Sequence, residues 1–464
     1  MAVQSWVSSG FHEQVVGVLD RQPIAALRIV RREFLSGVGW SSGPGHREGV
    51  APRIIRKLPS LSLDAITFIY KDNLLMDPKI NPFVPGAGTQ PPELAGRDDI
   101  IDSAKIALAR VKAGRHAKSQ MLLGLRGVGK TVLLNRIAGL GEDEGYHAVM
   151  MEAPEDRRLA DMVVPPLRHL LFKLSRREQA SEFAKRALGV VRSFANAFKV
   201  KVGDVEFSVD PETGTADSGH LESDLPEMLQ AVAKACKANG SGVALLIDEV
   251  QYLPLSDLAA LIVSVHMASQ KNDPLILFGA GLPQLAALTG EAKSYAERLF
   301  DYPEVGPLPE LAARDAIVAP IRREGADITD DAIATVLLKT RGYPYFLQEW
   351  GHHVWNVAPR SPITGHDAER ASSAAIRALD KGFFRVRFDQ LTPREKDYMR
   401  AMAELGPGPH RSGEVADNLG LDVRTAGPLR NGLIKKGMIY SPQHGDTAFT
   451  VPMFDEFMRR TMPK

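Results

Sequence analysis

The chain has 464 residues, a length at which about three folded units are expected rather than one. Apolar residues make up 44% and charged residues 24%, which argues against a disordered, collagen-like or coiled-coil protein. The 57 Lys and Arg side chains are balanced by 56 Asp and Glu side chains, so any contact with nucleic acid must come from a local basic patch.

Cysteine usage and apolar runs bear on the compartment. The single cysteine, Cys236, cannot form an intrachain disulfide, which is typical of a reducing environment. The longest apolar runs, such as 243–247 and 258–263, are far shorter than the ~18 residues that a membrane-spanning helix needs. The first residues lack the charged segment, apolar run and cleavage site of a secretory signal. We therefore expect a cytoplasmic protein without membrane contact.

The N-terminal part differs from the rest. Residues 1–75 combine a Gly/Ser/Pro-rich stretch with scattered arginines and weak periodicity, which predicts a poorly ordered extension. From residue 94 onward, helical and strand patterns alternate, as in a parallel α/β sheet with helices on both faces. Four short apolar runs are the candidate buried strands: 121–123, 148–151, 243–247 and 275–278.

The elements around these strands are mostly helical. Residues 155–240 predict a helical insert, interrupted near 198–209 by a period-2 alternation that indicates a hairpin. Ser256 is a candidate N-cap for a helix whose apolar residues, Leu258 to Val265, recur at helical spacing. This helix would join the last two strands.

After residue 307 the strand signal fades. We predict a helical lid over 307–388, in which Thr329 begins one helix that stops at Gly342. Thr392 and Glu395 then form a capping box with a proline at the first helical position, so a new unit begins near residue 390. The predicted organisation is an extension, an α/β core over 76–306, the lid, and a C-terminal unit over 389–464.

One segment matches a nucleotide-binding motif. Residues 124–131 read Gly-Leu-Arg-Gly-Val-Gly-Lys-Thr, the GxxxxGK[ST] pattern of a P-loop, between a predicted strand and a predicted helix. In this context Lys130 is expected to reach the β- and γ-phosphates, and the Thr131 hydroxyl to ligate Mg²⁺. The residues assigned to nucleotide binding are Gly124, Gly127, Val128, Gly129, Lys130 and Thr131. The alternative is a glycine-rich turn that opens an ordinary helix.

An apolar strand ends in two carboxylates. Residues 243–247 are followed by Asp248 and Glu249, which would place one carboxylate beside the metal and the next beside the attacking water. We assign Asp248 to Mg²⁺, through water, and Glu249 to water activation. The alternative is an exposed acidic turn, which the P-loop upstream makes the weaker interpretation.

Other P-loop classes fit less well. A GTPase would carry an Asn-Lys-x-Asp element after the later strands, and this sequence has none. A transporter ATPase would carry an LSGGQ-like signature shortly before the acidic strand, whereas the partial match at 35–39 lies upstream of the P-loop. Small-molecule kinases usually lack the paired Asp-Glu.

On these motifs the chain resembles the AAA+ ATPases, especially the branch shared by origin-recognition-type initiator ATPases and STAND signalling ATPases. The resemblance covers about residues 92–464 and implies ATP and Mg²⁺ as ligands. Gly96 and Arg97, in Leu-Ala-Gly-Arg-Asp-Asp, look like the adenine-side box that precedes the P-loop. Tyr343 and Pro344, in Thr-Arg-Gly-Tyr-Pro-Tyr, are similar to the GxP segment at the start of the lid. Simple turn chemistry is the alternative for both.

The resemblance also bears on assembly and rate. Arg298, in Ser-Tyr-Ala-Glu-Arg-Leu-Phe, looks like the arginine-finger box that contacts the γ-phosphate of a neighbouring subunit, which implies a nucleotide-dependent homo-oligomer. The alternative is a solvated surface arginine. Two features depart from the family: residues 278–281 read Phe-Gly-Ala-Gly where a polar sensor is usual, and no clear arginine follows Pro344 in its helix. Slow, switch-like hydrolysis is therefore expected.

The C-terminal unit resembles a winged helix. Ser412 would cap a short helix that Gly420 stops, and Thr425 would begin a second helix that Gly437 ends. Two strands, 438–441 and 447–451, would form the wing.

Basic residues on or beside the second of these helices could neutralise the phosphates of duplex DNA: Arg424, Arg430, Lys435 and Lys436. Arg430 and Lys436 in particular lack acidic partners nearby in that helix. The alternative is a solvated helix face on a protein-contact module.

The leading hypothesis is an ATP-dependent molecular switch whose nucleotide state repositions the winged helix on DNA. A STAND-like scaffold is the first alternative, in which ATP gates oligomerisation and the winged helix is an inhibitory clamp. A nucleotide-binding transcription factor that never hydrolyses is the second.

Overall fold

The structure is a computed structural model that describes residues 75–86, 88–153, 157–177, 180–200 and 209–463. The predicted N-terminal extension lies outside the described residues except for residue 75. Most of the hairpin predicted near 198–209 also lies outside them, since 201–208 are not described.

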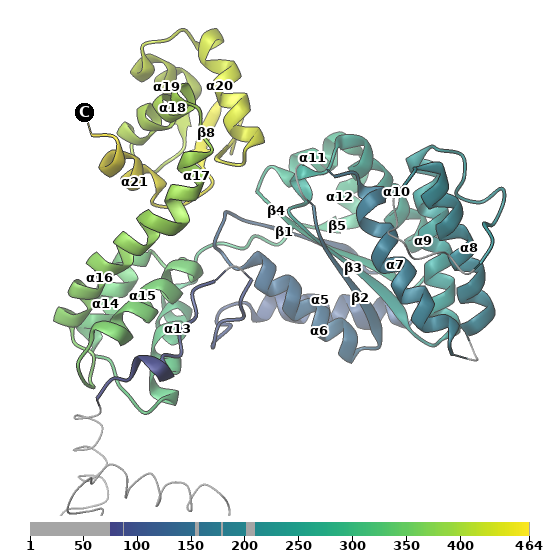
Figure 1. The fold of residues 1–464 in the computed structure, drawn as a ribbon, viewed down its shortest axis with the longest axis horizontal. Coiled ribbons are helices and arrows are strands. Elements are labelled where there is room, and N and C mark those ends of the chain that lie inside the picture. Colours follow the sequence, from purple (N-terminus) through teal and green to yellow (C-terminus); the bar gives the residue numbers. More distant parts are fainter. Residues whose placement is uncertain (1–74, 87, 154–156, 178–179, 201–208, 464) are drawn as a thin grey trace, which may run out of the picture. The chain divides into compact units, whose positions relative to one another are not determined.

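The core is a five-stranded parallel sheet with the strand order β2-β3-β4-β1-β5 (Figure 1). Its strands are β1 (Ser119–Leu123), β2 (Tyr146–Glu152), β3 (Gly242–Asp248), β4 (Leu275–Gly281) and β5 (Phe300–Asp301). The four predicted strands are confirmed, each longer than its apolar run. The two-residue β5 was not predicted. Because β4 lies between β1 and β3, the segments that follow β1 and β3 emerge close together at the carboxyl edge of the sheet.

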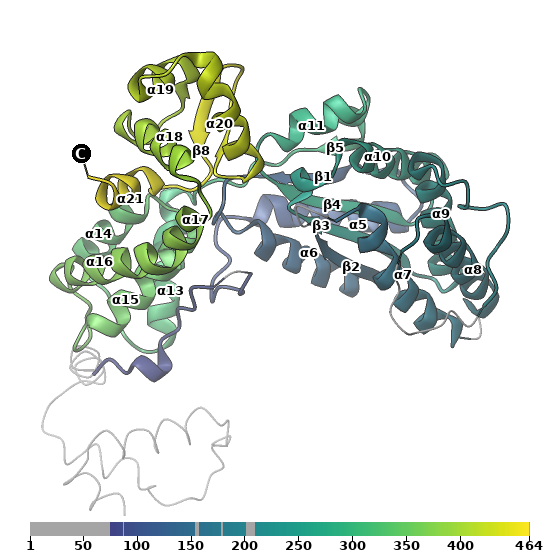
Figure 2. The same ribbon diagram turned by 45° about the horizontal axis from the view of Figure 1, so that its top comes forward.

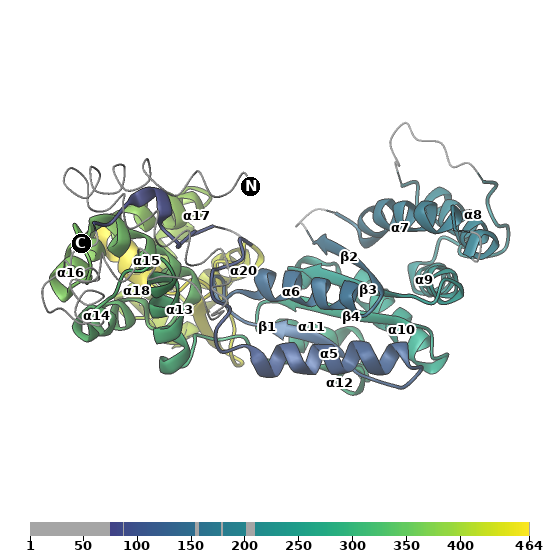
Figure 3. The same ribbon diagram turned by 90° about the horizontal axis from the view of Figure 1, so that it is seen from below.

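Helices cover both faces of this sheet, as predicted. They are α5 (Asp98–Lys112), α6 (Lys130–Asp143), α7 (Leu159–Ser175), α8 (Ser181–Ala197), α9 (Leu221–Ala238), α10 (Leu255–Gln270), α11 (Leu285–Ala292) and α12 (Ala296–Leu299). Side chains alternate along the strands: Leu246 and Phe278 pack with α5 and α6, whereas Leu245 packs with α7 to α10. Figure 3 shows α5 and α6 running alongside the strands.

The start of α10 corrects one prediction. Pro254 is the residue before the helix, and Ser256 lies inside its first turn, where its hydroxyl bonds to Asp257. The Asp257 carboxylate also accepts a hydrogen bond of 2.8 Å from the backbone N–H of Leu159, at the start of α7. The helix therefore begins before Ser256, and the Asp257 side chain in its first turn is hydrogen-bonded to the start of α7.

The predicted lid contains α13 (Glu310–Arg323), α14 (Asp330–Thr340), α15 (Pro344–Val357) and α16 (Gly365–Leu379). Their core surrounds two fully buried tryptophans, whose indole N–H groups are both satisfied. Trp350 donates to Ser372, and Trp355 donates to the carbonyl oxygen of Asp77. The second bond ties the segment that begins at residue 75 to these helices.

Substitution of Gly342 is expected to destabilise this part of the fold. Gly342 has φ 72°, and an added Cβ would lie 2.6 Å from the backbone oxygen of Leu308. Gly325 is a matched control, because it has φ 82° but open space around the same position. Gly342→Ala should therefore cost about 1–3 kcal/mol more than Gly325→Ala in urea unfolding, since only the first adds a clash. Equal costs would contradict this packing.

The C-terminal segment, residues 392–461, begins at the predicted capping box, which is confirmed. Its elements are α18 (Pro393–Glu404), β6 (His410–Arg411), α19 (Ser412–Leu419), α20 (Val423–Lys435), β7 (Ile439–Tyr440), β8 (Asp446–Phe449) and α21 (Phe454–Thr461). A π-helical turn (Asp380–Phe384) and α17 (Arg385–Asp389) connect α16 to it. Figure 2 shows α18, α19 and α20 gathered around β8.

Two helix starts in this segment differ from the predictions. Arg411, not Ser412, precedes α19, because the Glu414 carboxylate accepts a hydrogen bond from the backbone N–H of Arg411. The helix α20 begins at Val423 rather than Thr425, because the Asp422 side chain caps it. Both wing strands form as an antiparallel pair, and β6 adds a third strand that was not predicted.

Candidate functional site

The loop between β1 and α6 has the backbone of a phosphate cradle. Gly127 and Gly129 have φ values of 82° and 93°, which favour glycine, and α6 begins immediately after Gly129. Gly124 is fixed for another reason, because an added Cβ would overlap the carbonyl oxygen of Val305. The N–H groups of Gly124 and Arg126 already donate to other parts of the chain, so the N–H groups from Gly127 into the first turn of α6 are the ones available at the positive end of a helix.

Lys130 lies within this loop. Its side chain is only 7% exposed, and its ammonium donates hydrogen bonds of 2.9 Å to the carbonyl oxygens of Gly124 and Leu125. Burial lowers the pKa of Lys130, while the nearby carboxylates of Glu249 and Asp248 act in the opposite direction. The ammonium is thus held between the loop and the carboxyl edge of the sheet.

Thr131 and Asp248 meet at this edge. The Thr131 hydroxyl donates a hydrogen bond of 2.5 Å to one oxygen of Asp248, and the N–H of Glu249 donates to the other at 2.8 Å. Asp248 is 5% exposed, and burial raises its pKa, although the bond from Thr131 partly offsets the effect. The structure thus brings together a hydroxyl and a carboxylate, the oxygen donors that Mg²⁺ prefers.

Glu249 is held by two neighbours that the sequence did not reveal. Its backbone has φ 53°, and its carboxylate lies 3.7 Å from a guanidinium nitrogen of Arg126. The Gln251 amide donates to its other oxygen. The Gln251 carbonyl accepts a bond from the N–H of Leu282 and occupies the space that a side chain at Gly281 would need. This contact explains why no polar side chain stands at the end of β4.

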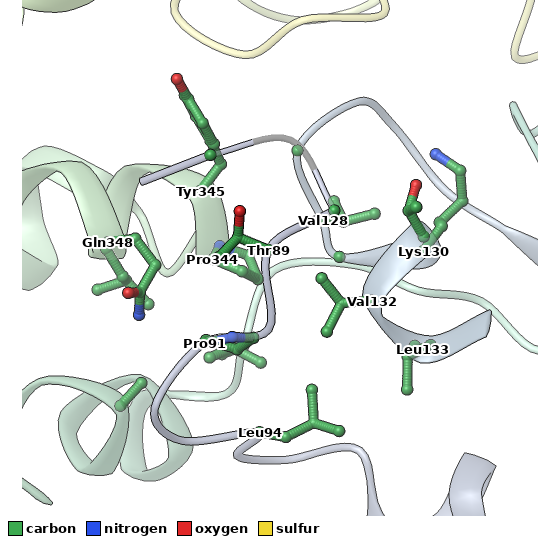
Figure 4. Close-up of a pocket in the computed structure, with 18 of the residues that line it drawn as sticks. Thr89, Pro91, Leu94, Val128, Lys130, Val132, Leu133, Pro344, Tyr345 and Gln348 are labelled. Carbon is green, nitrogen blue, oxygen red and sulfur yellow. The ribbon is translucent and has the colours of Figure 1, made fainter. Parts of the chain in front are cut away.

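A pocket of about 300 Å³ opens beside the P-loop. Of the residues assigned from sequence, it is lined by Gly127, Val128, Gly129, Lys130, Thr131, Glu249, Arg97 and Pro344. Figure 4 shows Thr89, Pro91 and Leu94 on one wall, with Val132 and Leu133 of α6 nearby. Thr89 and Pro91 were not predicted, because residues 88–93 carry no motif, whereas Leu94 opens the predicted adenine-side box. Tyr345 and Gln348 of α15 contribute another part of the lining.

Arg97 and Gly96 of the predicted adenine-side box hold the P-loop and its surroundings in place. Arg97 is 7% exposed, and its guanidinium donates to the carbonyl oxygens of Val128 and Gly306. Burial lowers its pKa. Gly96 has φ 64° and packs so closely on Ala312 that a Cβ would clash. Gly96 does not line the pocket, but Leu94, Ala95 and Arg97 of the same box do, so the box both supports the P-loop and forms part of the cavity wall.

The segment around Pro344, which was predicted to begin the lid, also contacts the P-loop. The N–H of Tyr345 donates a bond of 3.1 Å to the carbonyl oxygen of Gly127, and Pro344 is the first residue of α15. Tyr343 does not line the pocket; it packs between the core of α5 and α6 and the core of the lid helices.

Arg387 is a pocket residue that the sequence analysis missed. It lies on α17, well beyond the helix that follows Pro344, and its guanidinium is stacked 4.2 Å from the ring of Phe383. Burial lowers its pKa to about 10, with a further contribution from Arg126. Nothing in the sequence indicated that Arg387 lies near the P-loop, because its position depends on how α16 and α17 fold back.

Arg298 stands apart from the pocket. It lies on the four-residue α12, its side chain is exposed, and within the described part of the chain it has no ion-pair or hydrogen-bond partner. The structure therefore does not bring Arg298 together with the P-loop of its own chain.

The four candidate DNA contacts divide into two pairs. Arg430 donates to Thr447, Ser441 and the carbonyl oxygen of Asp446, and Lys436 pairs with Glu395 at 2.7 Å. Within the helix neither has an acidic partner, as predicted, but Lys436 finds one in α18, and Arg430 bonds to neutral oxygens of β8 and of Ser441.

The other pair remains free. Arg424 and Lys435 are exposed, and neither side chain has a partner among the residues that the structure describes. These two cations are therefore the ones that α20 presents to solvent.

Family models match two parts of the chain. Residues 93–278 match the AAA ATPase domain, and residues 381–458 match a domain of unknown function. The first match contains the P-loop and both carboxylates after β3, and the second covers most of the C-terminal segment. No curated protein matches the sequence.

One solved structure shares the fold, and others match the chain with lower scores. A Walker-type ATPase of Pyrococcus abyssi is 16% identical, with a TM-score of 0.52 over 80% of this chain and 97% of that chain. The Holliday junction branch migration motor RuvB of Thermotoga maritima is 15% identical over 78% and 96%, with a TM-score of 0.40. Orc1 of Aeropyrum pernix, in complex with DNA, is 14% identical over 83% and 97%, with a TM-score of 0.41. The first similarity concerns the fold alone, and the two lower scores support no further argument.

Within the described residues, no helix is long and apolar enough to cross a membrane.

Proposed function

Since residues 93–278 form an AAA ATPase domain, we propose that the protein binds ATP with Mg²⁺ and hydrolyses it slowly, as a switch. The observation that carries this proposal is the convergence of two pairs of residues at one end of the sheet: Lys130 and Thr131 at the start of α6, and Asp248 and Glu249 at the end of β3 and just after it. A phosphate cradle, a hard-cation donor pair and a second carboxylate beside them are the parts that phosphoryl transfer to water requires.

Each residue has a distinct role in this proposal. The loop N–H groups and Lys130 bind the β- and γ-phosphates and stabilise the charge that develops on them. Thr131 and Asp248 would hold Mg²⁺, which neutralises phosphate charge when bound. Glu249 orients the attacking water and accepts its proton. Arg387 faces the same pocket and would add a cation from the lid side.

Hydrolysis is tested by phosphate release at saturating ATP, with Mg²⁺ and with EDTA. We expect Mg²⁺-dependent release with a turnover below about 1 s⁻¹, at the low end of typical enzymes. ATP that is bound but never cleaved by any form of the chain would overturn the hydrolytic part of the proposal and leave a nucleotide-binding protein.

Acidification is expected to remove Mg²⁺-dependent ATP binding at a higher pH than an ordinary aspartate would. Burial raises the pKa of Asp248, and the metal ligand is the ionised form, so the ligand is lost as the pH falls through that raised pKa. The measurement is the ratio of ATP Kd values without and with Mg²⁺ over a pH series. Asp248→Asn should give a flat ratio. A parent ratio that holds down to about pH 3.9 would contradict the expectation.

The exposed position of Arg298 favours action on a neighbouring subunit in a nucleotide-dependent homo-oligomer, as the family resemblance implies. Assembly size in ATP against ADP tests this. If the protein stayed a monomer in both ATP and ADP, and Arg298→Ala hydrolysed ATP as fast as the parent, Arg298 would not act on a neighbouring subunit.

DNA contact is a second candidate function, favoured by the two exposed and unpartnered cations of α20. Arg424→Ala with Lys435→Ala should weaken binding to duplex DNA and lower the slope of log K against log salt by about two. Fluorescence anisotropy measures both quantities. Lys105→Ala with Arg115→Ala removes two exposed cations elsewhere and should change neither. Absence of salt-sensitive DNA binding in every nucleotide state would exclude the function.

A further inference from the structure

Arg126 connects the C-terminal segment to the proposed catalytic carboxylate. It is the third residue of the P-loop, and its backbone N–H donates a bond of 3.1 Å to the carbonyl oxygen of Thr450, just after β8. Its guanidinium donates a bond of 2.6 Å to the Tyr252 hydroxyl and lies 3.7 Å from Glu249. One residue thus contacts the C-terminal segment through its backbone and Glu249 through its side chain.

The contact on the C-terminal side is tightly built. Thr450 is fully buried, and its hydroxyl bonds to the carbonyl oxygens of Gly437 and Met438. Gly437 has φ 60°, and an added Cβ would lie 2.9 Å from the Arg126 guanidinium and closer still to the Tyr252 hydroxyl. The turn after α20 and the end of β8 therefore form one surface that is seated on Arg126.

The arrangement also places several cations together. Arg126 is near enough to Lys130 and Arg387 that its charge lowers the pKa of both. Glu249 is the nearby anion that relieves this repulsion, and it has a guanidinium at one oxygen and the Gln251 amide at the other. Each carboxylate oxygen thus already has a partner that competes with a water molecule for it, and a general base must contact that water at hydrogen-bond distance.

We propose that Arg126 is a positioning residue that withholds Glu249 from the attacking water while the C-terminal segment is seated on the P-loop. Displacement of the segment then releases the Arg126 side chain and allows hydrolysis. This inference rests on the proposed ATPase function and deepens it, because it names the contact that makes turnover slow.

The test compares four variants with the parent by turnover and by ATP Kd. Arg126→Ala removes the guanidinium, and Gly437→Ala disturbs its seat. Each of these two variants should raise kcat by at least about fivefold, which is the lower end of the range for coupling between two sites. The ATP Kd should stay within about threefold of the parent value. The double variant should gain no more than the better single variant, because both act through one contact. Gly420→Ala, also at positive φ (70°) but in open space, should match the parent.

The outcomes separate the inference from the function on which it rests. Hydrolysis by the parent that Arg126→Ala slows, or that Gly437→Ala leaves unchanged, overturns the inference and leaves the ATPase intact. An inert parent with an active Arg126→Ala variant supports both. ATP binding without hydrolysis in the parent and in every variant overturns both together. Any gain in Arg126→Ala must also disappear when Glu249→Gln is added, because the released group is Glu249.

Discussion

Lys130→Ala is expected to weaken ATP binding by at least about 100-fold. The Lys130 ammonium is buried and is already held 2.9 Å from two carbonyl oxygens of the P-loop. It therefore meets the β- and γ-phosphates with little loss of conformational freedom, and each of the two charge-assisted bonds contributes about 1.5–3 kcal/mol. The loss should be seen by calorimetry as a higher Kd for ATP.

Thermal unfolding distinguishes lost binding from misfolding. At about 100 times its Kd, ATP should stabilise the parent by about 2.7 kcal/mol, and the variant should gain almost nothing at the same concentration. Without ATP, the two lost bonds to Gly124 and Leu125 are partly offset by removal of a buried charge, so the variant should still unfold cooperatively. Lys105→Ala, on an exposed face of α5, is the matched control. An unchanged ATP Kd in Lys130→Ala would refute its phosphate role.

The predictable part of this protein is the part that local patterns encode. Buried parallel strands appear as short apolar runs, and a P-loop depends on glycines and a lysine that are consecutive in the chain. The strands β1 to β4 and the positions of Gly129, Lys130 and Asp248 could therefore be read before the structure. The two-residue β5 could not, because Phe300–Asp301 has neither length nor alternation and is ordered only by pairing with β1.

The residues that were missed depend on contacts between distant parts of the chain. Arg387 reaches the pocket only because α17 folds back toward the P-loop, and Gln251 is significant only because Gly281 leaves room for it. The partners of Arg430 and Lys436 were missed for the same reason: a helix shows its own neighbours in sequence, but these partners lie in β8 and α18. Side-chain contacts between distant segments leave no pattern in this sequence that could predict them.

Sequence and structure together change the expected cause of slow turnover. The missing polar sensor after β4 suggested a site with a part removed, but the Gln251 side chain fills that space and bonds to Glu249. With Arg126 on its other oxygen, Glu249 is present and restrained rather than unsupported. A restrained base can be released by movement of the C-terminal segment, whereas an absent sensor would fix the rate permanently.

Glu249→Gln is expected to reduce kcat by about 10²–10³-fold with little change in ATP affinity. The amide keeps the size of the side chain but cannot accept a proton from water, and general-base catalysis contributes a factor of this order. The carboxylate is not part of the phosphate cradle, so the ATP Kd should stay within about threefold. Single-turnover hydrolysis and equilibrium binding measure the two quantities separately.

A neighbouring carboxylate provides the control for this substitution. Glu152 ends β2 in register with Asp248, and its side chain is exposed, so Glu152→Gln removes a similar charge at the same edge of the sheet without touching the water site. It should hydrolyse ATP at the parent rate. If Glu249→Gln did so as well, the proton acceptor would have to lie elsewhere, and the restraint by Arg126 would have no catalytic group to act on. The rate of this one variant therefore decides whether the C-terminal segment can regulate chemistry at all through Glu249.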